Sequence, residues 1–504
     1  MTVTTIIRAD GSTLLGYGHV FRTLVLAEEL TIRGWKVVYV CRDLDGAPLS
    51  RIRDAGHGLV LLDADIDEPK DTEATARAAR EAGASWIVVD RYATDEQAHA
   101  LWRADGFKVL AIDDVCEHTF DVDILLNQNT DATELPYRTR ADTVRLLGPR
   151  YALVRPAYRK ARPAAPRKID QVKQVMVFMG GGDPDDATGK VVEALGSLPQ
   201  KLDVDVIVGS AYRYLERLQR LSEASPHRVR VLRDLPDLVE PMSRADVAIA
   251  AGGSVTWELC CMGVPMLLLP IADNQEGIAC SLQRLGAAKR IGRSELIKPS
   301  ELIADIEGSL IDADVLNRMA HACLNVVDGY GFLRVIGQLG IPPILLRRVR
   351  PEDGRLLFDW ANDPDVRRAA VNEQEIVWAE HTDWLKRKLV ASATAMWIGE
   401  WVDNGPIGQV RFDELIKGEA EVDVSVAREY RGRGLGGALI ATASRMAFAE
   451  TNWRVLHAHV KPWNVSSMRS FENAGFQNLG VGDMNGESMI HLILERYRGE
   501  ERKH

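Results

Sequence analysis

The sequence lacks the clustered cysteines of a zinc site or a disulfide framework. Such sites need closely spaced, repeated cysteines, and no CxxC pair is present. We therefore expect neither bound zinc nor disulfide bonds. The adjacent pair Cys260–Cys261 is better explained as small apolar helix positions than as a redox device. The six cysteines are scattered along the chain: Cys41, Cys116, Cys260, Cys261, Cys280 and Cys323.

An excess of basic residues and a long apolar run are missing as well. The net charge is −10, which argues against a nucleic-acid partner. The longest apolar run, PMLLLPIA at 265–272, is too short to cross a bilayer. The opening MTVTTIIRAD has no basic region followed by an apolar core, so we expect no signal peptide. These features predict a cytoplasmic protein without a membrane span, and they leave the oligomeric state open.

What the chain does have is length and a regular alternation of strands and helices. With 504 residues it is too long for one hydrophobic core. Its first 340 residues alternate continuous apolar runs with helical patterns, which is typical of parallel sheets covered on both faces. A proline-rich basic stretch, 155–168, interrupts the alternation and is interpreted as an exposed linker. The expected strands are 4–8, 36–41, 86–90, 108–113 and 123–127, then 174–179, 203–208, 228–232, 246–250 and 265–270.

A second break at 337–343 precedes a region of different character. Its expected strands at 395–401, 407–413, 420–426 and 454–460 often alternate polar and apolar residues, which suits a mostly antiparallel sheet with one helix-covered face. Helices are expected near 352–363 and 378–390. The predicted fold class is α/β: two doubly wound Rossmann-like domains followed by an α+β domain. The predicted domains are 1–160, 169–340 and 344–500.

Glycine-bearing turns follow expected strands within 7–21 and 178–186. Glycines in a strand-to-helix turn let backbone N–H groups approach an anion at the helix N-terminus. In IRADGSTLLGYGHVF (7–21) the turn holds Gly16 and Gly18, and His19 stands where the anion or a reacting sugar would lie. FMGGGDPDD (178–186) is a second such turn, whose acidic residues are expected to cap a helix. VVDRYATD (88–95) is a strand without this glycine turn; it ends beside the same predicted cleft, with Asp90 and Tyr92 open to a catalytic or a structural interpretation.

The segment ADVAIAAGGSVTWELCCMGVPMLLLPIADNQ (245–275) is the most informative. A buried strand ends in AGGS and a helix begins at about Ser254–Val255, so its first-turn N–H groups form a candidate diphosphate site. Glu258 lies one turn along, placed to accept hydrogen bonds from ribose hydroxyls. The next strand returns Asn274 and Gln275 to the same cleft.

This segment resembles the nucleotide-sugar half of GT-B glycosyltransferases of the lipid II synthase type. With the motifs above, and with AIDDV (111–115), LLNQN (125–129) and VDGYGFLRV (327–335), residues 3–340 resemble the UDP-2,4-diacetamido-2,4,6-trideoxy-β-L-altropyranose hydrolases of pseudaminic acid biosynthesis. The resemblance implies inverting, metal-independent hydrolysis, with His19 and Tyr92 catalytic. The substrate-binding residues that it implies are Arg8, Asp10, Gly16, Gly18, Arg22, Asp90, Gly181, Gly182, Gly253, Ser254, Val255, Thr256, Glu258, Asn274 and Gln275.

The last third contains a glycine-rich turn of another spacing, in AEVDVSVAREYRGRGLGGALIATASRMAF (420–448). Arg431, Gly434 and Gly436 fit Arg-x-x-Gly-x-Gly, and such a turn on a helix N-terminus binds a pyrophosphate. A Rossmann GxGxxG is the rival, but its spacing differs and no βαβ unit follows. With RVLHAHVKPWNVSSMRSFENAGF (454–476), residues 344–496 resemble the GNAT N-acetyltransferases, and WANDPDVRR (360–368), EHTDWL (380–385) and PIGQVRFD (406–413) resemble the branch acting on amino-sugar nucleotides.

The GNAT resemblance implies acetyl-CoA as donor and direct transfer to an amine. Many members have a tyrosine as thiolate acid where this sequence has Phe471; Tyr430 is a candidate substitute. The base stays open among His457, His459, Glu421 and Asp423. The implied acetyl-CoA-binding residues are Val424, Val426, Arg431, Gly432, Arg433, Gly434, Leu435, Gly436, Gly437, Asn464 and Ser467.

Together the two resemblances predict a bifunctional enzyme. It would acetylate a UDP-4-amino-4,6-dideoxy-N-acetyl-hexosamine with acetyl-CoA and then hydrolyse the product to free sugar and UDP. The alternative is a GT-B glycosyltransferase with a UDP-sugar donor, fused to an acetyltransferase. A second alternative is that one module serves only as a binding or scaffolding domain.

Overall fold

A computed structural model describes residues 3–13, 15–484 and 486–496. The chain divides into two compact units, 1–338 and 339–504, and each is considered by itself. The predicted domain ends at residues 1 and 500 lie outside the described residues. None of the described helices is long and apolar enough to cross a membrane.

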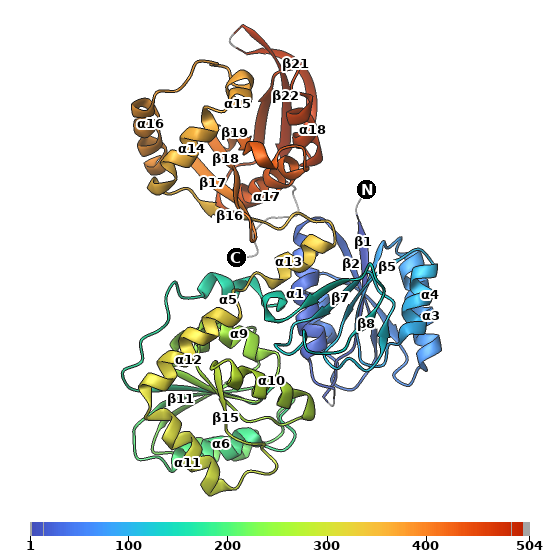
Figure 1. Ribbon diagram of the computed structural model, residues 1–504, viewed down its shortest axis with the longest axis vertical. Coiled ribbons are helices and arrows are strands. Elements are labelled where there is room, and N and C mark those ends of the chain that lie inside the picture. The colour runs from blue at the N-terminus through green and yellow to red at the C-terminus, as the bar shows by residue number, and fades with distance from the viewer. Residues whose placement is uncertain (1–2, 14, 485, 497–504) are drawn as a thin grey trace. The chain divides into compact units, whose positions relative to one another are not determined.

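The first half of unit 1 is built on a parallel sheet in the order β3-β2-β1-β4-β5-β7-β9. Helix α1 lies on one face of this sheet and α3 and α4 lie on the other (Figure 1). A separate two-stranded sheet pairs β6 with β8. The elements are β1 (Thr4–Ala9), α1 (Gly18–Ile32), β2 (Lys36–Arg42), α2 (Leu49–Asp54), β3 (Gly58–Leu62), α3 (Glu68–Glu81), β4 (Trp86–Asp90), α4 (Glu96–Ala104), β5 (Lys108–Ile112), β6 (Thr119–Phe120), β7 (Ile124–Asn127), β8 (Arg138–Thr139), β9 (Val144–Leu147) and η1 (Pro149–Tyr151).

The second half of unit 1 is another parallel sheet, ordered β12-β11-β10-β13-β14-β15. Both faces of β10 are buried: Val175 and Val177 pack in a cluster with α6 and α11, and Met176 packs in a cluster with α9. The elements are α5 (Pro156–Ala161), β10 (Gln174–Phe178), α6 (Ala187–Gly196), β11 (Asp203–Val208), α7 (Leu215–Ala224), β12 (Arg228–Arg233), α8 (Val239–Arg244), β13 (Val247–Ala250), α9 (Val255–Met262), β14 (Met266–Leu268), α10 (Asp273–Arg284), β15 (Ala288–Arg290), α11 (Pro299–Leu310), α12 (Ala313–Val326) and α13 (Gly331–Gln338).

The stretch 155–168, predicted to be an exposed linker, connects the two sheets of unit 1 but is exposed only in part. Residues of this stretch form α5, and Tyr158 is fully buried against α9. Arg162 donates to the backbone oxygens of Cys261 (2.9 Å) and Leu324 (2.6 Å), carbonyls at helix ends that have no partner within their own helix. Proline content and charge gave the appearance of a solvated segment, whereas the arginines in fact satisfy buried backbone groups. At the end of the unit, α13 returns to pack against α1.

Unit 2 contains a sheet ordered β16-β17-β18-β19-β20-β22-β21, antiparallel except for the parallel pair β19–β20. Helices α17 and α18 cover one face, and α14 and α16 pack over β17 on the other (Figure 1), so helices lie on both faces rather than on the predicted one. The elements are β16 (Ile344–Arg348), η2 (Pro351–Asp353), α14 (Gly354–Ala361), α15 (Pro364–Ala369), α16 (Trp378–Val390), β17 (Thr394–Trp401), β18 (Gly405–Ile416), β19 (Glu419–Val426), η3 (Arg428–Tyr430), α17 (Leu435–Glu450), β20 (Val455–Val460), α18 (Val465–Asn473), β21 (Gln477–Met484) and β22 (Glu487–Glu495).

Candidate active sites

The first candidate site is centred on a histidine at the start of α1. β1 and β4 are neighbours in the sheet, with Ala9 opposite Asp90, so the loop that leads into α1 lies beside the carboxyl end of β4. His19 Nδ1 is 2.7 Å from Asp90 Oδ1, and Arg22, one turn later, donates to both Asp90 oxygens at 2.6 Å. Burial alone would raise the pKa of Asp90, but Arg22 and His19 lower it to about 2. Asp90 is therefore ionised and accepts hydrogen bonds only.

This arrangement fixes the tautomer of His19. Nδ1 of His19 lies 2.7 Å from Asp90 Oδ1 and 3.3 Å from Arg22 Nη2. Because the contact with Asp90 is much the shorter and a carboxylate can only accept, Nδ1 carries the proton that joins His19 to Asp90. The neutral ring then has its lone pair on Nε2, and 14% of the side chain remains exposed. A histidine oriented by a buried carboxylate, with its second nitrogen free, is suited to general base catalysis.

Tyr92 packs beside this histidine. The ring lies edge-on to that of His19, with centroids 4.9 Å apart, and its hydroxyl is 3.3 Å from Asp114 Oδ2. Burial first, and then the nearby Asp114, raise the pKa of Tyr92 beyond its ordinary range, so the phenol keeps its proton. Asp114 also binds Arg22 (2.8 Å) and Asn129 (3.1 Å).

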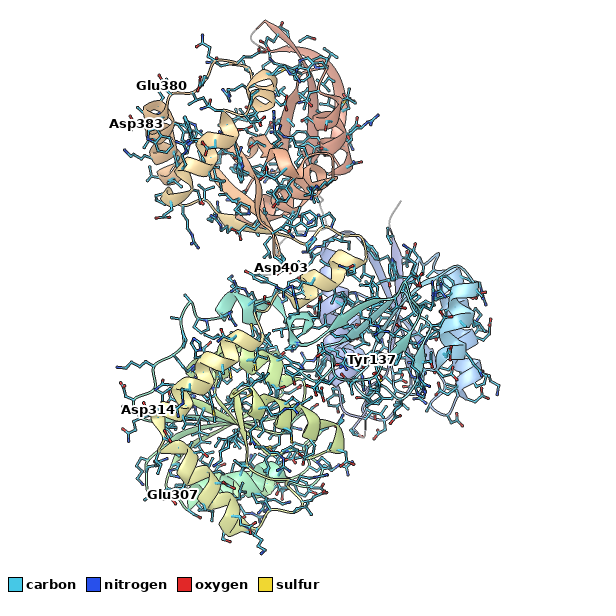
Figure 2. All side chains as sticks on the ribbon, in the orientation of Figure 1. Tyr137, Glu307, Asp314, Glu380, Asp383 and Asp403 are labelled. Atoms are coloured by element: carbon cyan, nitrogen blue, oxygen red, sulfur yellow. The ribbon has the colours of Figure 1, made fainter. Side chains whose placement is uncertain are left out.

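Asp114 and Asn129 were not among the residues predicted to form the site, although their motifs, AIDDV and LLNQN, were noted. Each follows the carboxyl end of a parallel strand, β5 or β7, where such sheets bind ligands; this signal could have found them. The loop that holds Asp114 is fixed by Asp113, which accepts from Cys116 N (2.7 Å) and from the hydroxyl of Tyr137 (2.6 Å). Figure 2 labels Tyr137, which lies just before β8.

The second half of unit 1 brings a helix N-terminus to the same place. A Cβ added at Gly18 would stand 3.9 Å from Ser254 Oγ, so the starts of α1 and α9 face each other. Among the described residues, no side chain caps α9, which leaves its positive end available to an anion. Asn274 at the start of α10 lies close enough to the hydroxyl of Tyr92 to affect its pKa.

The other predicted residues of this helix and its neighbour hold the turn together. The Thr256 hydroxyl is buried and donates to Gly253 O (2.8 Å). Gln275 Oε1 accepts from Ile271 N (2.9 Å), and its Nε2 lies 3.9 Å from where a Cβ on Gly253 would be. Val255 is buried, whereas Ser254 is exposed. The structure thus brings His19, Tyr92, Ser254 and Asn274 close to one another, at the starts of α1, α9 and α10 and the end of β4.

Glu258 lies one turn into α9, beside Tyr158 and Arg155. Burial raises the pKa of Glu258 to about 7, a rise that Arg155 and the hydrogen bond from Tyr158 only partly offset. Strongly displaced pKa values are more frequent at binding and catalytic sites.

Two predicted contacts do not fit the structure: Arg8 and Asp10 are not free to bind substrate. Arg8 is fully buried, and its guanidinium is joined to Asp10 (2.6 Å) and Asp71 (2.6 Å). Asp10 is also bound to Arg42 (2.9 Å) and Arg91 (3.0 Å). The ion pairs of Arg8 and Asp10 are satisfied within the protein, and they stabilise the end of β1, from which the loop to α1 begins.

Three predicted glycines contact the loop that precedes α1 or belong to it. Gly16 has a φ of 78°, which only glycine adopts freely. A Cβ at Gly181 would stand 2.9 Å from the Tyr17 ring, and one at Gly182 would stand 3.8 Å from Thr13 O. They let the loops after β1 and β10 approach closely. As expected, the nearby acidic residues are caps: Asp183 accepts from Ala187 N (2.9 Å) and Asp186 from Gly189 N (3.0 Å).

The second candidate site is the turn between β19 and α17. Gly432 and Gly434 have φ angles of 74° and 73°, a left-handed turn that aims successive N–H groups at one point. No described side chain caps α17, and Leu435 begins it. Arg431 closes the turn by donating to Val426 O (2.9 Å), and its guanidinium also meets Asp363 (3.0 Å).

Of the remaining residues of this turn, one is exposed and two pack against α18. Arg433 is exposed, 5.7 Å from the Tyr430 ring. A Cβ at Gly436 would stand 3.0 Å from Ser470 Oγ, and one at Gly437 would stand 3.2 Å from Ser470 O. Gly437 is buried against α18, where the absence of a side chain permits close helix packing.

The strands beside the turn carry the other predicted residues. Val424 and Val426 are half-buried on β19. Asn464 caps α18 by accepting from Ser467 N (3.1 Å). Phe471 is buried against the Phe476 ring, and the Tyr430 hydroxyl donates to Asn404 O (3.0 Å).

Comparison with protein families matches both modules. Residues 175–328 match the glycosyltransferase family 28 C-terminal domain, and residues 344–477 match the acetyltransferase (GNAT) domain. The chain joins a family 28 glycosyltransferase-like module to a GNAT domain. This confirms both resemblances and the predicted fold class.

Relatives of known and unknown activity align with different parts of this fusion. The UDP-2,4-diacetamido-2,4,6-trideoxy-β-L-altropyranose hydrolase of Campylobacter jejuni is 24% identical over 284 residues, 55% of this chain and 96% of that protein. An uncharacterized protein of Methanocaldococcus jannaschii is 22% identical over 94% of this chain and 97% of its own. The crystal structure of Acinetobacter baumannii MurG, at 18% identity and a TM-score of 0.50, covers 68% of this chain and 99% of its own; it shares the fold of the family 28 module.

Proposed function

We propose that the chain performs two consecutive steps on a cytoplasmic nucleotide sugar. The GNAT domain acetylates the 4-amine of a UDP-4-amino-4,6-dideoxy-N-acetyl-hexosamine with acetyl-CoA. The family 28 module then hydrolyses the UDP-diacetamido-trideoxy-hexose to free sugar and UDP, with inversion and without a metal ion. The observation that carries the hydrolase half is the Asp90–His19 pair, which orients His19 at the start of α1, close to the start of α9, which no described side chain caps.

The hydrolysis follows from these groups. His19 Nε2 accepts a proton from water, and the water oxygen attacks the anomeric carbon from the face opposite UDP. The anomeric C–O bond breaks with its electron pair going to the diphosphate, which the first-turn N–H groups of α9 stabilise. Tyr92, which contacts Asp114 and lies close to Asn274, orients the water or the sugar. Glu258 accepts from the ribose hydroxyls. The likeness to the C. jejuni hydrolase supports this reaction.

The acetyltransferase half is supported by the turn after β19. The left-handed glycines Gly432 and Gly434 and the uncapped start of α17 suit the pyrophosphate of acetyl-CoA. Arg433 is exposed beside them and supplies a positive charge. Asn464 keeps its side-chain N–H₂ available for the pantetheine amide, because only its oxygen is used in the cap of α18.

The charge of the sugar amine favours acetylation before hydrolysis. An oxocarbenium-like transition state develops positive charge on the ring, and an ammonium group on the same ring would repel it. Acetylation removes that charge, so the acetylated sugar should lose UDP faster than the amine.

A second candidate is transfer of the sugar to an acceptor rather than to water. The family 28 match, whose name denotes a glycosyltransferase, and the fold shared with MurG favour it. In that case the oriented histidine would deprotonate an acceptor hydroxyl instead of water.

The test is UDP release by the purified chain from the UDP-4-amino-sugar, with and without acetyl-CoA and without any acceptor. We expect CoA thiol and UDP together, and little UDP when acetyl-CoA is omitted. Thiol without UDP would refute the hydrolase and favour the transferase. UDP at the same rate in both cases would refute the order of steps. EDTA in the same assay tests metal independence.

A further inference from the structure

We propose that His459 is the general base of acetyl transfer and that Glu421 is the residue that positions it. This rests on the proposed acetyltransferase activity of the GNAT domain. It selects one of four candidates that the sequence leaves equal.

Strands β19 and β20 of unit 2 separate beside the turn that is proposed to bind the pyrophosphate of acetyl-CoA. β19 and β20 pair at only three positions, the last being Glu421 opposite His457, although β19 continues to Val426 and β20 to Val460. The strands therefore separate after Glu421, and the pyrophosphate-binding turn begins just beyond the end of the β19 arm. An extended pantetheine chain that runs from this turn between the separated strands places its thioester near the point where they separate. His459 is the first residue on the polar face of β20 beyond that point.

The face of the sheet that carries His459 is polar and opposite to the core. Ala420, Val422, Leu456 and Ala458 point into the cluster with α17, so the residues that alternate with them point away from it. The ionisable groups that the strands place on that second face are Glu419, Glu421 and Asp423 of β19, His457 and His459 of β20, His491 and Glu495 of β22, and Arg411 and Asp413 of β18. Arg411 pairs with Asp423 (2.9 Å).

Hydrogen bonding distinguishes His459 from its neighbour on the strand. His457 is bonded at both ring nitrogens, to Glu419 (2.7 Å) and to His491 (2.9 Å). His459 is bonded through Nδ1 to Glu421 (2.8 Å), and its Nε2 has no partner among the described residues. With Glu421 accepting at Nδ1, the neutral ring holds its lone pair on Nε2. The side chain is 21% exposed, so this lone pair can meet a ligand.

The other histidine of the group, His491, supports His459 from the next strand. Its ring lies parallel to that of His459, at 4.8 Å and 10°, and its β22 position is directly opposite His459. Burial first, and then the two neighbouring histidines, lower the pKa of His491, so it stays neutral and limits the rotation of His459. Among the described residues, no cluster of histidines, cysteines and carboxylates fits a metal ion.

The reaction then proceeds as follows. His459 Nε2 takes one proton from the acceptor ammonium, and the freed amine lone pair attacks the thioester carbonyl carbon. The C–N bond forms and the carbonyl π electrons move to oxygen. When the carbonyl re-forms, the C–S bond breaks, and the departing sulfur takes the second ammonium proton to leave as CoA thiol. The imidazolium returns its proton to water.

The test compares His459→Gln with His457→Gln, the same change on the same strand and face but in the paired part of the sheet. CoA thiol release is measured against pH with the UDP-4-amino-sugar and with a panel of simple primary amines. We expect His459→Gln to lower kcat/KM roughly 10²- to 10⁴-fold, with the deficit shrinking as the pH approaches the acceptor's own pKa, where the amine needs no base. His457→Gln should stay within about threefold of the wild type, since no reacting group meets it.

Two further variants separate catalysis from structure. His459→Ala should be partly rescued by added imidazole. Glu421→Gln should lower kcat and change the shape of the pH profile without raising KM for acetyl-CoA. A pH-independent loss in His459→Gln, an equal loss in His457→Gln, or no imidazole rescue would each overturn the proposal. If the wild type acetylates only simple amines, the proposed substrate fails while the base is still tested on those amines; thiol release with no amine at all would refute both.

Discussion

Substitution of Glu258 by Gln should weaken UDP binding and, at high pH, increase the free energy of unfolding. Burial raises the pKa of this carboxyl from 4.5 to about 7, so the folded chain holds the carboxylate less readily than the unfolded chain does. Since one pKa unit corresponds to about 1.4 kcal/mol, the ionised form destabilises the fold by at most about 3 kcal/mol above pH 7. Because part of the side chain meets water, we expect about 1–2 kcal/mol.

The sign of the pH dependence follows from the raised pKa. A group that binds its proton more tightly when folded contributes stability at low pH, and this contribution is lost as the pH rises from 4.5 through 7. Glu258→Gln removes the charge and nearly keeps the shape. At pH 8 the variant should therefore be more stable than the wild type, with a melting temperature roughly 2 °C higher; at pH 5.5 the two should differ less.

Binding should respond the other way. The proposed role of Glu258 is to accept hydrogen bonds from ribose, and hydrogen bonds to a charged group contribute about 1.5–3 kcal/mol. Glu258→Gln should weaken UDP binding at pH 8 by about tenfold or more. UDP binding to the wild type should itself weaken as the pH falls below 7, while that of the variant should change less.

The assays are thermal unfolding of the full chain and calorimetric titration with UDP, both at pH 8 and 5.5. Glu276→Gln is the matched control, because a hydrogen bond from Arg290 lowers the pKa of Glu276, so this variant should lose a little stability at both pH values. Equal destabilisation by Glu258→Gln at both pH values would refute the stability argument. Unchanged UDP affinity would refute the ribose contact.

Three further predictions concern the other groups. His19→Asn and Asp90→Asn should each slow UDP release roughly 10²- to 10⁴-fold with wild-type thiol release; a loss of both products would indicate misfolding instead. Gly434→Ala forces a side chain into backbone with φ 73°, a strain of about 1–2 kcal/mol, and should raise KM for acetyl-CoA in initial-rate assays while UDP release from the acetylated sugar stays unchanged. Burial lowers the pKa of His99 from 6.5 to about 4, so stability is lost as the pH falls below 6.5, about 2 kcal/mol by pH 5; His99→Phe should flatten this part of the melting-temperature profile, and an unchanged slope would contradict the assignment.

The sequence predicted the elements well where burial is continuous or strictly alternating. All ten strands expected in the first 340 residues are present, and the turns before α1, α9 and α17 lie within a residue or two of their expected places. These features are local: an apolar strand followed by glycine and a helix leaves few alternatives. Short or exposed strands such as β9, β15 and β21 were missed, because their periodicity is weak.

Side-chain partners were harder to predict, since they depend on which strands become neighbours. Arg8 lies in β1 and His19 lies in α1, and nothing in the residues around either of them names its partner. Arg8 pairs with Asp71 of α3, and His19 meets Asp90 at the end of β4, so both contacts depend on the tertiary fold. The misjudged exposure of 155–168 has the same origin, because the carbonyls that its arginines bind belong to α9 and α12, far along the chain.

The two candidate bases, His19 and His459, share one arrangement of hydrogen bonds, and this shared arrangement is the main argument for them. In each module a carboxylate accepts from Nδ1 of a histidine, and Nε2 is left facing the place where the substrate is expected: Asp90 with His19, and Glu421 with His459. Two other histidines lack this arrangement, because His457 is bonded at both ring nitrogens and His99 is buried. Water and an ammonium group both need a neutral imidazole nearby to lose a proton near pH 7. A carboxylate-oriented histidine therefore serves the proposed acetylation and the proposed hydrolysis alike, although the two folds that supply it are unrelated.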